Sequence, residues 1–76
     1  MDELLKYLNA LPRTEQERLA ASCSTTLGYL RKAIYSGELL RPALCVAIER
    51  ETGKRITRQV LREDWIDIWP ELSEAA

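Results

Sequence analysis

Residues 16–35 read QERLAASCSTTLGYLRKAIY, and this stretch decides the fold of the chain. The small hydroxyl residues within 22–26 prefer caps and turns to helix interiors, so they divide the stretch into two short helices. Helices that cross closely require a small residue at the crossing point, and Ala20 suits that place. We therefore predict a helix-turn-helix motif over about residues 15–35, whose second helix is built to enter a DNA groove.

The spacing of apolar residues around the turn supports this motif. The inward positions lie just before the crossing point, just before the turn and inside the second helix, and they hold Leu19, Cys23, Leu30 and Ala33. Two turn positions depart from the usual pattern. Ser24 stands where glycine is common, and Thr25 stands where an apolar residue is common.

The second helix has a distinct outward face. At about 100° per residue, Gly28, Arg31, Lys32 and Tyr35 gather on the side opposite the apolar residues. Arg31 suits bidentate contact with guanine, and Leu27 suits a thymine methyl group. The predicted base-reading residues are Thr26, Leu27, Gly28, Arg31, Lys32 and Tyr35. A basic helix face that is only solvated is the competing interpretation.

Phosphate contacts are expected from polar side chains near helix N-termini and from a basic loop. Hydroxyl groups, amides, cations and helix N-termini all bind phosphate oxygens. The motif supplies hydroxyl groups, an amide and helix N-termini, and a run of cations follows Gly53. The predicted phosphate-binding residues are Gln16, Thr25, Tyr29, Lys54, Arg55 and Arg58.

Capping signals predict where the helices before residue 37 begin and end. A first helix is expected over 3–11, with Asp2 as its N-cap and Pro12 as its stop. A capping box from Thr14 to Glu17 is expected to open the second helix, which ends at about Ser22. Thr25 or Thr26 caps the third helix, which runs to about Tyr35 and ends at the C-cap glycine Gly37.

The second half of the chain predicts two more helices and a tryptophan-containing end. A fourth helix starts at Pro42, with Leu44, Val46, Ala47 and Ile48 on its apolar side, and closes at Thr52-Gly53. Thr57 caps a short fifth helix that holds Val60 and Leu61. Residues 64–70 form a final helical turn or an extended arm. We expect Trp65 and Trp69 to complete a thin core, with a partner-binding hot spot as the alternative.

Charge is divided unevenly along the 76 residues. The formal net charge is −1, yet residues 25–58 carry +4 and residues 59–76 carry −4. A polyanion responds to a local patch more than to the total, so the basic middle is compatible with DNA. The acidic end is expected to be a solvated tail.

Composition argues against several classes of function. The chain has no histidine, and Cys23 and Cys45 form no CxxC pair, so neither a metal site nor a cofactor is expected. No nucleophile or phosphate loop points to catalysis, so we expect a non-enzyme. No apolar run reaches the length of a membrane span, and the acidic start is not a signal peptide. Both cysteines are expected to be buried thiols in a cytoplasmic protein.

Nearly the whole chain resembles the YdaS-like family of Cro/CI-type helix-turn-helix proteins encoded on prophages. The most distinctive part is the ending Arg62-x-x-Trp65-x-x-x-Trp69-Pro-Glu-Leu. The other matching segments are 19–23, 28–34, 41–49 and 56–59. Members commonly have glycine where this chain has Ser24 and proline where it has Glu63.

The resemblance implies an all-α, compact, five-helix lambda-repressor-like domain over 1–76, with its tryptophan-containing segment at about 62–76. It also implies regulation of a phage-derived operator in double-stranded DNA, through a homodimer or a cooperative assembly. Family members are often described as parts of YdaS/YdaT toxin–antitoxin pairs. The alternative function is therefore a toxin–antitoxin component that acts through a protein partner.

Overall fold

The computed structural model describes residues 2–74, with side chains described through Ser73, and all of its regular structure is helical. The predicted all-α class is therefore confirmed for these residues. Seven helices lie within residues 2–74, two more than the five predicted, because the tryptophan-containing segment, expected as one helical turn or an extended arm, forms two single turns. The helices are α1 (Asp2–Asn9), α2 (Arg13–Ser22), α3 (Leu27–Ser36), α4 (Pro42–Glu51), α5 (Arg58–Leu61), α6 (Trp65–Ile68) and α7 (Glu71–Glu74).

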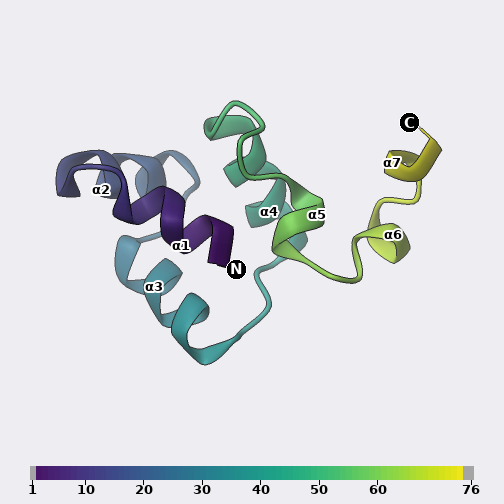
Figure 1. Cartoon of the computed structure of the whole chain (residues 1–76), viewed down its shortest axis with the longest axis horizontal. Coiled ribbons are helices and arrows are strands. Elements are labelled where there is room, and N and C mark those ends of the chain that lie inside the picture. Colours follow the sequence, from purple (N-terminus) through teal and green to yellow (C-terminus); the bar gives the residue numbers. More distant parts are fainter. Residues whose placement is uncertain (1, 75–76) are drawn as a thin grey trace.

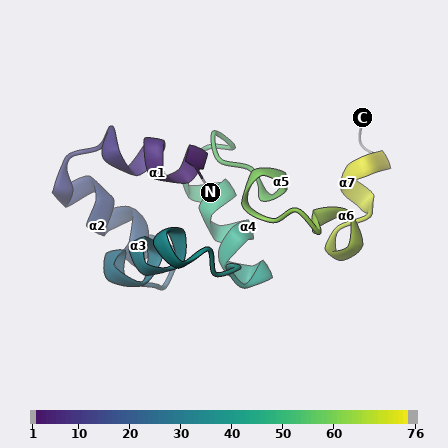
Figure 2. The same ribbon diagram turned by 60° about the horizontal axis from the view of Figure 1, so that its bottom comes forward.

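The four longer helices surround one core, and the short ones extend from it. Helix α2 packs against α3 and α4, α1 packs against α3, and α5 links α4 to α6. Figures 1 and 2 show α6 and α7 projecting from one end of the molecule, beyond α5. None of the described helices is long and apolar enough to cross a membrane.

The core is built from the residues that the apolar spacing selects. Leu4 and Leu8 of α1, Leu30 of α3 and Ile48 of α4 are completely buried. The predicted inward positions of the motif are also confirmed as core: Leu19, Ala20, Cys23, Leu30 and Ala33. The expected apolar side of α4 needs one correction. Val46 is 37% exposed, and the neighbouring Cys45 takes the buried place instead.

Several predicted helix ends are confirmed. Thr26 is the N-cap of α3, and its Oγ1 accepts a hydrogen bond from the backbone N–H of Tyr29 at 3.1 Å. Gly37 ends α3 with a left-handed φ of 71°, which glycine adopts without steric cost. Pro42 occupies the first turn of α4, and Thr52 is its C-cap. Thr57 is the N-cap of α5, but its side chain makes no capping hydrogen bond.

The predicted capping box at the start of α2 is wrong. Pro12 is the N-cap, with an extended backbone (ψ 154°), so the helix starts earlier and already includes Thr14. Glu17 pairs with Arg13 at 3.3 Å instead of reaching back to a cap. The first helix also differs from the prediction, because Asp2 lies within it and it ends at Asn9.

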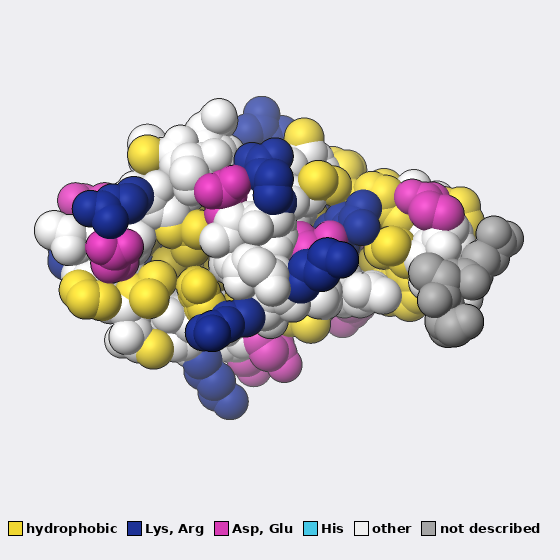
Figure 3. Space-filling view, turned by 90° about the horizontal axis from the view of Figure 1, so that it is seen from above, with side chains coloured by type: hydrophobic (Ala, Val, Ile, Leu, Met, Phe, Trp, Pro, Cys, Tyr) yellow, Lys and Arg dark blue, Asp and Glu magenta, His cyan; other side chains and the backbone are white. Residues whose placement is uncertain are grey.

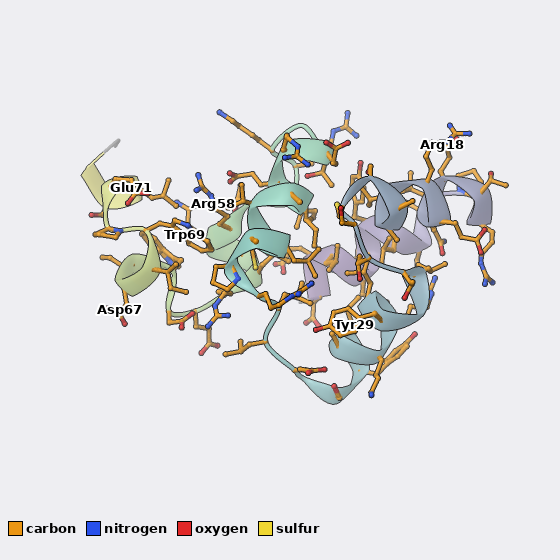
Figure 4. All side chains as sticks on the ribbon, turned by 180° about the vertical axis from the view of Figure 1, so that it is seen from behind. Arg18, Tyr29, Arg58, Asp67, Trp69 and Glu71 are labelled. Carbon is orange, nitrogen blue, oxygen red and sulfur yellow. The ribbon has the colours of Figure 1, made fainter. Side chains whose placement is uncertain are left out.

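The C-terminal segment is held by two arginines and a tryptophan. Trp69 is only 9% exposed, and the Arg58 guanidinium carbon lies 5.2 Å from the centre of a Trp69 ring (Figure 4). Arg62 donates to the backbone oxygen of Leu40 at 2.7 Å and forms two 2.8 Å hydrogen bonds with Asp64. The predicted core role of the tryptophans is thus confirmed for Trp69, and Trp65 packs half-buried against the same cluster.

Candidate nucleic-acid interface

The turn between α2 and α3 has the backbone that a tight helix–helix connection needs. Ser24 has a φ of 60°, in the left-handed region that favours glycine. The backbone N–H of Thr25 donates to the oxygen of Ala20 at 3.0 Å, and the N–H of Ser24 donates to the oxygen of Ala21 at 3.0 Å. The chain therefore makes the sharp turn at the expected position, with serine in place of glycine.

The outward face of α3 is open to solvent. Gly28, Lys32 and Tyr35 are exposed, and Tyr35 is 70% exposed. A Cβ atom added at Gly28 would meet no atom within 4 Å, so packing within the chain does not require glycine there. This face combines space for close approach with a cation and an aromatic hydroxyl.

Leu27 does not belong to this face. Its side chain is only 7% exposed and forms part of the core cluster. It begins α3, but its side chain turns inward against the other helices. The predicted contact between Leu27 and a thymine methyl is therefore wrong.

Gln16 is not available to a phosphate, because its amide is used within the protein. The residue is 7% exposed. Its Nε2 donates to the backbone oxygens of Leu8 at 2.7 Å and Leu11 at 2.9 Å. Its Oε1 accepts a 2.7 Å hydrogen bond from Nη2 of Arg31. The predicted phosphate contact by Gln16 is wrong, and the side chain supports a base-reading candidate instead.

Sequence reasoning missed this pairing. Gln16 and Arg31 lie 15 positions apart on two different helices, and no periodicity connects them. The one sequence signal for an internal partner was that Gln16, a polar residue, lies on the same side of α2 as Leu19 and Ala20, which are buried.

Arg58 is also occupied by the protein itself. Its Nε lies 2.9 Å from Oε1 of Glu49, and the side chain is 20% exposed. The approach angle does not meet the geometry of a hydrogen bond, so the contact is an ion pair. Arg58 also lies over the ring of Trp69, so it attaches the end of α6 to α5. Its predicted phosphate contact stays a prediction, and the structure gives the side chain a role within the protein.

The remaining phosphate candidates lie in different places. Lys54 and Arg55 are exposed, but Figures 1 and 2 place their loop, between α4 and α5, on the opposite side of the molecule from α3. Thr25 is half-buried at the α2–α3 turn, and Tyr29 lies half-buried on α3 (Figure 4). Of these phosphate candidates, only Thr25 and Tyr29 thus lie near the base-reading candidates of α3.

Charges elsewhere on the surface are mixed. Figure 3 shows cations and carboxylates interspersed on the face that lies opposite α3 in Figure 1. Arg18 pairs with Glu15 at 2.9 Å, and Arg50 pairs with Glu51 at 2.8 Å. These pairs neutralise the local field, so that face offers no continuous positive surface to a polyanion.

Both cysteines are buried free thiols, as predicted. Burial raises the pKa of Cys23, and it raises the pKa of Cys45 to about 11. A thiol with a raised pKa is a poor nucleophile at neutral pH, because the thiolate is the reactive form. These groups therefore act as small core residues.

Comparisons of the chain with protein-family models, with curated proteins and with solved structures found no match.

Proposed function

We propose that this protein binds double-stranded DNA as a prophage-type transcription regulator, with α3 in the major groove. In this proposal α1 to α5 form a lambda-repressor-like domain, and α6 and α7 are an added C-terminal segment. The observation that carries the proposal is the pair α2 and α3, joined by a left-handed turn at Ser24, with one face of α3 buried and the other free.

The free face has the chemistry of a base-reading surface. Arg31 keeps donors beyond the one that Gln16 binds, and a guanidinium matches the O6 and N7 acceptors of guanine. Lys32 supplies a second cation, and Tyr35 supplies a hydroxyl at the far end of the helix. Gly28 lets the groove edge approach the backbone closely.

A single domain of this size covers only a short DNA site. We therefore propose that it acts as a homodimer or as a cooperative assembly on repeated half-sites, spaced by about one turn of the duplex.

The first test is binding to DNA taken from around its own gene, beside an unrelated duplex of equal length, at 50 and 200 mM salt. If four phosphates are contacted, affinity should fall roughly a hundredfold between these salt concentrations. Preferential and salt-sensitive binding supports the proposal. Equal and weak binding to both duplexes contradicts sequence-specific recognition.

A matched pair of charge reversals locates the surface. R31E/K32E reverses two charges on α3, and K54E/R55E makes the same change on the opposite side of the molecule. We expect the first variant to lose specific binding and the second to keep most of it. Equal losses would show that total charge, rather than the face of α3, determines affinity.

One observation favours the alternative, a toxin–antitoxin component that acts through a protein partner. Leu39 is 56% exposed and lines a hollow with Ile34 and Val60, between α3 and α5. An apolar docking surface would give binding that is insensitive to salt, so the same salt series separates the two functions.

A further inference from the structure

Gln16 makes three hydrogen bonds with groups from two other helices or their ends. Both of its N–H groups are donated to the C-terminal end of α1, at the backbone oxygens of Leu8 and Leu11. Its carbonyl oxygen accepts from Arg31 on α3. The amide is therefore a link between α1 and the outward face of α3.

The orientation of this amide is fixed by the chemistry of its partners. Two backbone oxygens can only accept hydrogen bonds, so the NH₂ group must face them. A flipped amide would set its oxygen against both acceptors and its NH₂ group against the guanidinium, leaving buried groups unsatisfied. The Gln16 oxygen must consequently point at Arg31.

The hydrogen bond to Gln16 restricts the side chain of Arg31. Its Nη2 is held 2.7 Å from the Gln16 oxygen, and the residue is half-buried. A guanidinium is planar, so fixing one nitrogen at the end of a packed stem restricts the whole group. An arginine side chain without such a partner would lose its conformational freedom only on binding DNA, whereas folding has already restricted the side chain of Arg31.

We propose that Gln16 is a positioning residue that sets the orientation of Arg31 for base recognition. The inference rests on the proposed function and deepens it. Helix α1 has no predicted DNA contact, yet through Gln16 it determines which base Arg31 reads.

The test is a double-mutant cycle on DNA. Q16M, R31M and Q16M/R31M are compared with the unaltered chain on the bound site and on variants of it with single base-pair changes. We expect Q16M to bind about 2- to 10-fold more weakly, because Arg31 must then be ordered on binding. Its base preference should flatten at the same base pair as that of R31M, and the double variant should bind no more weakly than R31M.

Two further variants separate positioning from general stability. Q16E sets an oxygen against the acceptors at the end of α1 and pairs Arg31 with a full negative charge, so it should be less stable than the unaltered chain and should also lose the base preference. T52V removes the buried hydroxyl that bonds to Ile48 and Ile56, far from α3, and should leave the base preference unchanged. All variants are measured at a temperature where circular dichroism shows them folded.

An NMR measurement gives a readout without DNA. Rotation of the Arg31 guanidinium should be slow in the unaltered chain and fast in Q16M, with the exposed Arg41 fast in both. The inference is overturned if the guanidinium rotates fast in the unaltered chain, or if the affinity losses of Q16M and R31M multiply in the double variant. Either result leaves the proposal of DNA binding intact. Failure of the unaltered chain to bind any duplex overturns the proposed function, and with it the role of Gln16 in recognition.

Discussion

The arginines of this chain show that the partners of a cation within the protein have to be identified before the cation is assigned to DNA binding. Arg58 and Arg62 are 20% and 13% exposed, and each is paired with a carboxylate. Both serve to attach the C-terminal segment to the rest of the fold. Arg31 is also bound, but through one nitrogen to a neutral amide, which leaves its charge available. Of these three, only Arg31 remains suited to a nucleic acid.

The pairing of Arg62 with Asp64 predicts a dependence of stability on pH. The hydrogen bonds from Arg62 lower the pKa of Asp64 below its ordinary value of 3.8. Because the folded-state pKa is the lower one, the contribution to stability is present above about pH 4 and is lost as the pH falls through that folded-state value. D64N should therefore be less stable than the unaltered chain at pH 7, and the difference should shrink toward pH 2.

Chemical unfolding at pH 7, 4 and 2 measures this difference. D67N is the control, because Asp67 is exposed on α6, and it should stay close to the unaltered chain throughout. A D64N difference that is constant with pH would contradict a role for the ionised carboxylate.

At the scale of helices, local signals located most boundaries. Capping by Thr26, the left-handed Gly37 and Pro42 in the first turn of α4 each depend on a few neighbouring residues, so the sequence indicates them directly. The start of α2 was missed because two local signals competed. Pro12 itself takes the N-cap position, so α2 has already begun at Arg13 and Thr14 lies inside it.

The two threonines that precede α3 and α5 provide a matched prediction. Thr26 makes a side-chain capping bond and Thr57 makes none. T26A should therefore lower the free energy of unfolding by about 1 kcal/mol, while T57A should have a much smaller effect. Urea unfolding without DNA checks both. Equal losses would mean that the cap bond of Thr26 contributes nothing specific.

The turn at Ser24 predicts a stabilising change. A left-handed backbone costs a residue with a Cβ roughly 1–2 kcal/mol, and glycine avoids this cost while losing about 0.4–1 kcal/mol through its freer unfolded state. S24G should therefore raise the free energy of unfolding by about 0.5–1 kcal/mol. S24A retains the strain and should change little. A loss of stability in S24G would show that the serine side chain contributes to the turn.

Across the whole molecule, a feature could be predicted from the sequence when the residues that form it lie close together along the chain. The core positions and the outward face of α3 follow from spacing within one helix. The burial of Leu27, the Gln16–Arg31 bond and the position of the Lys54–Arg55 loop depend on how helices far apart in sequence are placed together. A pattern along the chain does not contain that information, so these parts of the predicted site were wrong or missed.

The same arrangement predicts how the C-terminal segment fails. Trp69 is buried against Arg58 and the core, whereas α6 packs against α5 and α7 (Figure 2). W69A should lower the free energy of unfolding by about 3 kcal/mol, a large share of what a domain of this size has. I66A, which changes a side chain that is 49% exposed, is the control and should stay within about 0.5 kcal/mol.

The damage in W69A should be confined to one end of the molecule. Since α2 and α3 pack against each other and against α1 and α4, their backbone amide signals should keep their positions at temperatures where the variant is folded. NMR spectra of W69A, taken beside the unfolding curves, check this. Displaced α3 signals would mean that the C-terminal segment supports the DNA-facing helix, and W69A would then weaken DNA binding as well as stability.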